Sequence, residues 1–253
     1  YMLARSTGGA TVRAGGDTWF FITADYAFGH SLEKDASEII KSEGGKIVGS
    51  VKHPLNTQDF SSFMLQAQAS KAKVVGLANA GGDTINAIKS ANEFGLTKNQ
   101  KLAGLLVFIN DVHALGLNVT KGMQLTEAFY WDMNDETRKF SRRFFERMKK
   151  MPNMLQSGSY SSTLHYLNAV KATGTDDTAT VMAWMKANPI NDMFVKNGRI
   201  REDGRMMREM YLFEVKDPSE SKYPWDYFKL KATIPAEQAF MPASKSVCPL
   251  LKK

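Results

Sequence analysis

Four short apolar segments, each followed by a stretch with the apolar spacing of a helix, run through the first half of the chain. The apolar segments are residues 18–23, 46–51, 73–78 and 101–107. Helices are predicted at about 29–43, from Asp59 as N-cap, from 82 to 94, and near 111–117. Strands that alternate with helices in this way build a parallel sheet with helices on both faces. The pattern therefore predicts one α/β lobe in the first half of the chain.

After residue 125, helical segments dominate, and they are predicted at about 134–149, 158–173 and 178–187. The stretch NGRIREDGR (197–205) contains Asn-Gly and Asp-Gly, which favour a hairpin, and residues 210–215 have the pattern of a strand. These elements supply no full sheet. The helix faces that carry Phe140, Phe144 and Phe145 are therefore expected to need a partner surface.

Composition and charge argue against several classes of protein. The chain has 253 residues, is 43% hydrophobic and carries a net charge of +7. Because its basic residues are scattered, we expect solvated surface charge and no nucleic-acid partner. The single Cys248 argues against a disulfide framework or a cysteine zinc site.

Motifs for catalysis are also missing from the sequence. The histidines lie too far apart for a metal motif, and there is no nucleophile elbow. A Rossmann-like oxidoreductase would need a glycine-rich loop after the first strand, where the chain reads ADYAFG. We therefore expect no metal, no cofactor and no enzymatic activity.

Several motifs, taken in order, carry a family resemblance. They are the aromatic-glycine pair in ADYAFG, DFSS at a helix start, the Gly81-Gly82 turn, SGSYSSTLHYLNAV and the hairpin GRIREDGR. With these motifs, the chain from about residue 18 to residue 249 resembles the periplasmic solute-binding proteins of branched-chain-amino-acid-type ABC transporters.

The resemblance implies the type I periplasmic binding protein fold, in which two lobes, each a parallel sheet flanked by helices, are joined by a hinge. It implies that residues 17–125 form a complete α/β lobe, to which the tail at about 226–253 returns. Residues 126–225 are then the later half of the other lobe. The first half of that lobe is expected to be absent from this chain and to be associated with it as a separate N-terminal segment.

The same resemblance implies a function in transport. The expected partners are a small carboxylate ligand and an ABC permease in the inner membrane, and the expected state is a periplasmic monomer. A ligand-binding domain of a sensory receptor on the same fold is the alternative.

The ends of the predicted strands supply the candidate ligand-binding residues, because ligands of open α/β sheets bind beyond the carboxyl ends of the strands. After the first strand, the resemblance places Phe28 against the ligand, with Tyr26 nearby; core packing is the alternative for Phe28. After the third strand, the turn NAGGDT offers Asn79, Gly82, Asp83 and Thr84. Glycine lets a ligand approach the backbone, and a helix start suits an anionic group. Helix capping is an equal alternative for Asp83.

Two further regions complete the predicted site. Phe108 and Asn110 follow the fourth strand, and the resemblance places Tyr160 near the ligand side chain, with core packing as an equal alternative. Amino-acid binders of the family carry an acidic residue where this chain reads LLVFIN, which argues against an α-amino ligand. Pockets of this kind are mostly apolar with a few polar groups. We therefore expect a small organic carboxylate, with aromatic acids ahead of branched-chain amino acids.

Overall fold

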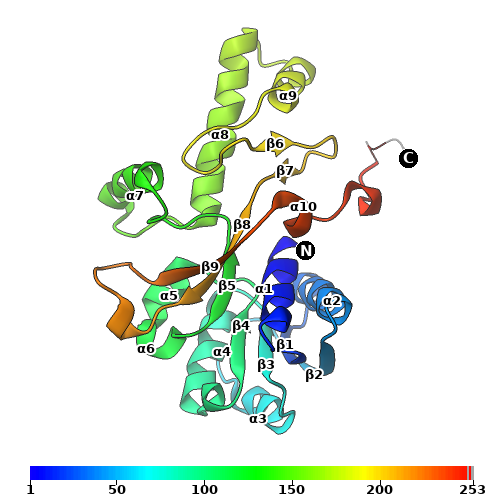
Figure 1. The fold of residues 1–253 in the computed structure, drawn as a ribbon, viewed down its shortest axis with the longest axis vertical. Helices are drawn as coiled ribbons and strands as arrows, with labels where there is room; N and C mark the ends of the chain where they lie inside the picture. The colour runs from blue at the N-terminus through cyan, green and yellow to red at the C-terminus, as the bar shows by residue number, and fades with distance from the viewer. Residues whose placement is uncertain (250, 252–253) are drawn as a thin grey trace. The chain divides into compact units, whose positions relative to one another are not determined.

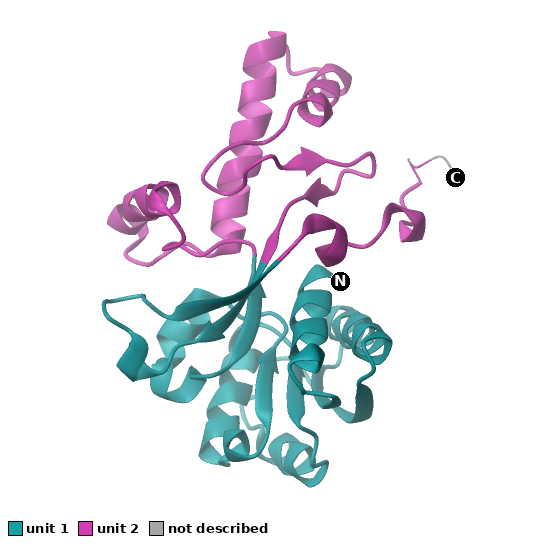
Figure 2. Ribbon diagram, in the orientation of Figure 1, with its two compact units in different colours: residues 1–127, 211–233 teal, residues 128–210, 234–253 magenta. Residues whose placement is uncertain are grey.

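The computed structural model describes residues 1–249 and 251, and it divides the chain into two compact units. Unit 1 consists of Tyr1–Glu127 and Tyr211–Thr233, and unit 2 consists of Ala128–Met210 and Ile234–Lys253. Figure 1 labels the helices and strands, and Figure 2 shows unit 1 in teal and unit 2 in magenta. None of the described helices has both the length and the hydrophobicity needed to cross a membrane.

Unit 1 is built on a mainly parallel sheet of seven strands in the order β2-β1-β3-β4-β5-β8-β9. The strands are β1 (Thr18–Ala24), β2 (Lys46–His53), β3 (Val74–Ala78), β4 (Lys101–Gly104), β5 (Gln124–Glu127), β8 (Met210–Val215) and β9 (Phe228–Ile234). The first five pair in parallel, as the β-then-α pattern predicts, whereas β8 runs antiparallel to β5. The central strand β3 is buried along its whole length, which explains its continuous apolar sequence.

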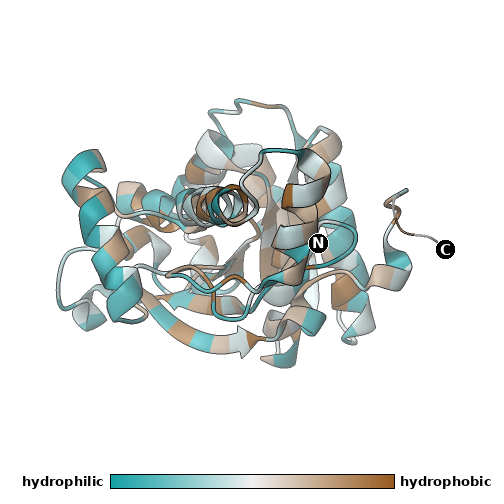
Figure 3. Cartoon of the chain, turned by 90° about the horizontal axis from the view of Figure 1, so that it is seen from above, coloured by the Kyte–Doolittle hydropathy of each residue, from teal (hydrophilic) through white to brown (hydrophobic). Residues whose placement is uncertain are grey.

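The helices of unit 1 follow the strands as predicted. They are α2 (Ala27–Ser42), α3 (Ser61–Ala69), α4 (Gly81–Glu93), α5 (Ile109–Leu115) and α6 (Leu117–Thr120), with short 3-10 turns at Leu96–Lys98 and Pro218–Glu220. Trp19, Leu32 and Ile40 belong to the buried core that joins the sheet to α2. Hydrophilic and hydrophobic residues are mixed around the helices in Figure 3, as expected for helices with one face against a core.

Helix α1 (Met2–Arg13) was not predicted. Its glycines disfavour a helix in isolation, so its formation depends on tertiary packing. A Cβ atom added to Gly8 would lie only 3.3 Å from Cγ1 of Ile40, which shows how closely α1 approaches α2. The buried hydroxyls of Thr7 and Thr126 lie 2.9 Å apart and join α1 to β5.

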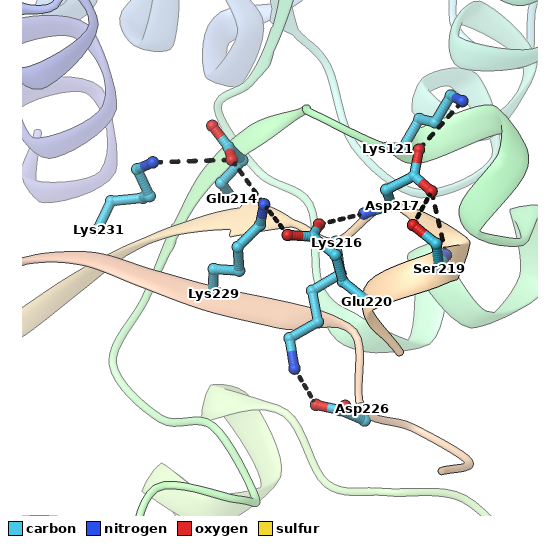
Figure 4. Close-up of polar contacts among 9 residues, drawn as sticks. All are labelled: Lys121, Glu214, Lys216, Asp217, Ser219, Glu220, Asp226, Lys229 and Lys231. Atoms are coloured by element: carbon cyan, nitrogen blue, oxygen red, sulfur yellow. Dashed lines mark hydrogen bonds and ion pairs between the residues drawn. The ribbon is translucent and has the colours of Figure 1, made fainter. Parts of the chain in front are cut away.

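The hairpin formed by β8 and β9 closes one side of the sheet of unit 1 and carries a network of ion pairs (Figure 4). Lys229 lies 2.7 Å from Glu220 and 3.4 Å from Glu214, and Lys121 lies 3.2 Å from Asp217. Lys216 pairs with the buried Asp226. The pair of Lys121 and Asp217 joins the hairpin to the segment before β5, whereas the other pairs lie within the hairpin.

The C-terminal part of the chain differs from the expected return of residues 226–253 to the complete lobe. Residues 211–233 belong to unit 1 because β8 pairs with β5, and the chain from 234 onward belongs to unit 2. Two contacts join that segment to the hairpin of unit 2. Glu237 lies 2.7 Å from Arg199, and the carbonyl of Met241 accepts a 2.9 Å hydrogen bond from Arg201. The compact units change at residues 210 and 233, whereas the expected boundary lies at residue 225.

Unit 2 contains the three predicted helices and the predicted hairpin. Its elements are α7 (Asp135–Met148), α8 (Met154–Thr173), α9 (Thr178–Ala187), β6 (Arg199–Ile200), β7 (Met206–Met207), α10 (Ala236–Ala239) and a 3-10 turn at Ala243–Lys245. Helix α8 begins four residues before the predicted start, because Asn153 caps it by accepting a 2.8 Å hydrogen bond from the N–H of Leu155. Phe140 is buried within unit 2, whereas Phe144 and Phe145 are half-buried.

Candidate functional site

The candidate residues of unit 1 gather at one edge of its sheet. The register pairs Thr23 with Ala78 and Leu77 with Gly104, so β1, β3 and β4 end at the same level. The segments that follow these strands carry the predicted residues: Tyr26, Phe28, Asn79, Gly82, Asp83, Thr84, Phe108 and Asn110. This edge is where ligands of open α/β sheets bind.

Two aromatic rings stand at the end of β1. Tyr26 is the N-cap of α2 in extended backbone conformation and is 37% exposed. Its ring centroid lies 5.8 Å from that of Phe28, which is half-buried and packs against the core of unit 1. Phe28 therefore packs against the core, as its alternative role requires. Part of its ring is also exposed, next to the more exposed Tyr26.

Asn79, at the end of β3, is fully buried in a hydrogen-bonded chain of side chains. Nδ1 of His53 lies 2.8 Å from the carbonyl oxygen of Pro54, which can only accept, so Nδ1 carries the proton. Nε2 of His53 then accepts from Nδ2 of Asn79 at 3.1 Å, and Thr84 donates to Oδ1 of Asn79 at 2.7 Å. The side chains of Asn79 and Thr84 thus form hydrogen bonds inside unit 1 and are not exposed to a ligand.

The start of α4 offers backbone at the same edge. Gly82 is exposed, and a Cβ added there would meet nothing within 4 Å. Gly81 has a φ of 59°, a conformation that glycine adopts without strain. Asp83 is buried and accepts a 3.2 Å hydrogen bond from the N–H of Asn56, and the N-cap of α4 is Ala80. Asp83 therefore fixes the loop after β2, and capping is not its role.

The start of α5 is held by two carboxylates. Phe108 is the N-cap, and its N–H donates to Asp111 at 2.9 Å. The next N–H, that of Ile109, donates to the fully buried Glu127 at 3.0 Å. Burial raises the pKa of Asp111, and the hydrogen bond from Phe108 opposes this effect. Phe108 and Asn110 are both half-buried beside these groups.

Tyr160 belongs to unit 2 and is not part of this edge. It lies on α8, is 40% exposed, and its ring centroid lies 5.0 Å from that of Phe140 on α7. Its aromatic contact is therefore local to unit 2, while a large part of the ring faces solvent.

Sequence reasoning missed His53 and Glu127, which both lie at carboxyl ends of strands. His53 is the last residue of β2, two residues beyond the predicted strand end, and Glu127 is the last residue of β5. The available signal was a polar residue near the end of a short β-type run, two residues after KIVGSV for His53 and directly after MQLT for Glu127. Among the described residues, no group of three His, Cys, Asp or Glu side chains could hold a metal ion.

The fold and the side chains at this edge define a class of protein: a binding protein of two compact units that presents aromatic and polar groups beyond the ends of parallel strands. The model of the periplasmic binding protein family matches residues 1–222. The chain therefore belongs to the periplasmic binding protein family, whose fold is the type I fold of ABC-transporter solute-binding proteins.

Solved structures of relatives agree with this assignment. A periplasmic binding protein from Burkholderia mallei is 57% identical, with a TM-score of 0.94, over 99% of this chain and 67% of that chain. A branched chain amino acid ABC transporter periplasmic ligand-binding protein from Burkholderia xenovorans LB400 is 41% identical, with a TM-score of 0.90, over 98% of this chain and 67% of that chain.

A third solved structure supports the fold alone. It is a solute-binding protein from R. palustris in complex with benzoate, which is 20% identical with a TM-score of 0.78, over 92% of this chain and 63% of that chain. A search of curated proteins found no significant match.

Proposed function

We propose that this solute-binding protein binds a small organic carboxylate, and that aromatic acids are its preferred ligands. The observation that carries the proposal is the ring pair of Tyr26 and Phe28, 5.8 Å apart at the end of β1. Phe28 stands where the resemblance places a ligand-contacting aromatic, and the half-buried Phe108 follows β4 at the same edge. Exposed aromatic surface of this kind favours a planar ring, because stacked or edge-on rings attract one another.

The remaining groups of the proposed site are backbone and polar side chains. The open backbone at Gly82 lets an anionic group approach the start of α4. Asn110 at the start of α5 and Tyr160 of unit 2 supply further contacts. Three predicted residues support the site indirectly, because their side chains form hydrogen bonds with other residues of unit 1: Asn79, Asp83 and Thr84.

A branched-chain amino acid is the second candidate ligand, and one observation favours it. The carboxylate of Glu127 lies beside the start of α5, 3.0 Å from the N–H of Ile109. An acidic group is thus close to Phe108 even though LLVFIN contains none. The 41% identical relative is described as a branched chain amino acid transporter protein, which supports the same candidate.

The proposed mechanism is hinge closure. The ligand contacts both units, so it stabilises the closed form and shifts the population toward that form. An ABC permease then recognises the closed, ligand-loaded monomer. The family indicates an extracytoplasmic location, and we place the protein in the periplasm.

We further propose that a polypeptide segment covers one face of α8. Leu155 and Tyr166 lie three helical turns apart on the same face, and they are 54% and 42% exposed. The chain spans 67% of its two more similar relatives, so part of each relative has no counterpart here. A segment equivalent to that part would bury this apolar face.

The test is a thermal-shift screen with aromatic acids, aliphatic carboxylates and amino acids, because a ligand that binds the folded state raises the melting temperature. We expect a shift with aromatic acids that is smaller in Phe28→Ala. The matched control is Phe94→Ala, since Phe94 is also half-buried but lies at the far end of α4. A shift with leucine or valine alone would establish the second candidate. No shift with any carboxylate would refute the proposed function.

A further inference from the structure

A pocket of about 310 Å³ lies within unit 2, between α7 and the first half of α8. Its lining residues are Phe140, Arg143, Phe144, Arg147, Met148, Gln156 and Tyr160. All of them belong to unit 2. The pocket is therefore complete within one unit, and its size is at the lower end of the range typical of small-molecule sites, about 300–1,000 Å³.

The apolar wall of the pocket is aromatic and accessible. The ring centroid of Phe140 lies 6.3 Å from that of Phe144 and 5.0 Å from that of Tyr160. Met148 and Tyr160 are 52% and 40% exposed. The ring of Phe140 is tilted by 37° to that of Phe144 and by 55° to that of Tyr160, so an incoming ring can contact the face of one and the edge of another, which favours an aromatic ligand.

The polar wall of the pocket is cationic. Arg143 and Arg147 make no ion pair or hydrogen bond with any described residue, whereas Arg138 on the same helix pairs with Asp135 at 2.8 Å. Arg143 and Arg147 are four residues apart, so their like charges lie on the same face of α7 and repel each other. An anion placed between them would remove this repulsion and accept charge-assisted hydrogen bonds from both guanidinium groups.

Gln156 adds a directional group. Its Oε1 accepts a 2.9 Å hydrogen bond from the N–H of Asn153 as part of the cap of α8. Its Nε2 makes no hydrogen bond with the described residues and remains a donor. The pocket thus combines aromatic carbon with N–H donors and contains no carboxylate.

We propose that this pocket binds a small organic anion that carries an aromatic ring, such as an aromatic carboxylate, at a site independent of the edge of unit 1. The anionic group lies between Arg143 and Arg147, and the ring packs among Phe140, Phe144 and Tyr160. This site shares Tyr160 with the contacts of the proposed function but goes beyond that function, because it uses no residue of unit 1 and needs no hinge closure.

The experiment is a calorimetric titration of the full chain with benzoate, and with benzyl alcohol as the uncharged analogue. The variant Arg143→Gln/Arg147→Gln removes two charges from the pocket. The control Arg142→Gln/Lys150→Gln removes two charges from exposed positions of the same chain region that do not line the pocket. Circular dichroism confirms that each variant is folded.

In the Phe28→Ala background, which removes the proposed site of unit 1, we expect the pocket variant to bind benzoate at least about tenfold more weakly, as the loss of charge-assisted hydrogen bonds predicts, and the control variant to bind unchanged. Benzyl alcohol should bind far more weakly than benzoate. Equal affinities of the two variants, or no binding of benzoate at millimolar concentration, would overturn the proposal.

The variant Phe28→Ala separates this site from the proposed function. It should leave benzoate binding at the pocket unchanged, even if the site in unit 1 is lost. If Phe28→Ala abolishes all benzoate binding, the ligand binds at the edge of unit 1 and the pocket proposal is wrong. If Phe28→Ala has no effect on any carboxylate and the pocket variant abolishes binding, the pocket stands and the role of Phe28 fails.

Discussion

Nδ2 of Asn79 lies 3.1 Å from Nε2 of His53, and neither side chain is exposed to solvent. His53 is held from its other side by the carbonyl of Pro54, and Asn79 receives the hydroxyl of Thr84. The amide of Asn79 thus joins the last residue of β2 to the beginning of α4. Its Nδ2 donates to His53, and its Oδ1 accepts from Thr84.

We expect Asn79→Ala to destabilise the protein by about 2–4 kcal/mol, because it leaves buried groups of His53 and Thr84 without partners. Chemical denaturation measures this loss. Asn86→Ala, on α4, is the control, since it removes one hydrogen bond to the carbonyl of Thr57 at a partly buried position. A small effect of Asn79→Ala on stability, together with a large loss of ligand affinity, would instead make Asn79 a ligand contact.

The two glycines at the start of α4 should respond differently to substitution. Gly81→Ala places a side chain at a φ of 59°, and we expect a loss of about 1–2 kcal/mol from the strained left-handed backbone. Gly82→Ala meets nothing within 4 Å, so its effect on stability should be small. The free energy of unfolding of both variants is measured in parallel, and equal losses would contradict the backbone argument.

Gly82→Ala is also a test of ligand approach. If a ligand approaches the backbone at this position, the added methyl group should weaken binding although stability is kept. An unchanged affinity would exclude close approach at Gly82.

His113 should titrate below its ordinary pKa of 6.5, because the burial of part of its ring penalises the charged imidazolium. The two ring centroids lie 3.8 Å apart, and Nδ1 of His113 lies 2.8 Å from the hydroxyl of Tyr227. A folded-state pKa below the unfolded value means that this contribution to stability is present above pH 6.5 and is lost as the pH falls through the folded-state pKa. Histidine NMR signals followed against pH give the midpoint.

The substitution Trp225→Gly provides the control for this titration. Trp225 has a φ of 69°, a conformation that glycine also adopts, so Trp225→Gly removes the side chain without straining the backbone. The midpoint of His113 should then rise toward 6.5. A midpoint that is the same with and without the ring would show that Trp225 does not cause the shift.

Asp217 should stabilise the β8–β9 hairpin only above acidic pH. Hydrogen bonds from the backbone and side chain of Ser219, and then from Lys121, lower its pKa to about 2. Because the folded pKa lies below the ordinary value of 3.8, its contribution is complete above that pH and is lost as the pH falls toward 2. The melting temperature of Asp217→Asn should therefore be lower than that of the unchanged protein at pH 6, and the difference should shrink at pH 3. A difference that does not change with pH would show that the charge is not the cause.

The sequence predicts the strands and helices of unit 1 well where apolar periodicity is strong. The four predicted β-then-α segments correspond to β1 to β4 and the helices that follow them. The prediction fails where tertiary packing decides the structure, as for the glycine-containing α1, or where the strand is short or alternates with lysine, as for β5 and β9. The predicted fourth strand ends at Gly104 and not at residue 107, because α5 begins soon afterwards at Ile109.

In the candidate site too, the sequence predicts what depends on local pattern but not what depends on tertiary contacts. Strand ends can be found from the sequence, so the residues that follow β1, β3 and β4 were identified. The orientation of each side chain cannot, because it depends on contacts such as that of Asn79 with His53. The pocket of Arg143 and Arg147 was also missed, because it exists only where α7 packs against α8.

The pairing of Glu127 with Tyr211 makes most of unit 2 an insertion between two adjacent antiparallel strands. Residues 128–210 leave from the end of β5 and return at the start of β8, which are neighbours in the ladder. Replacing this excursion with a short reverse turn would convert β5 and β8 into an ordinary hairpin. Unit 1 could then be produced as an isolated domain, and the candidate residues at the ends of its strands could be studied without unit 2.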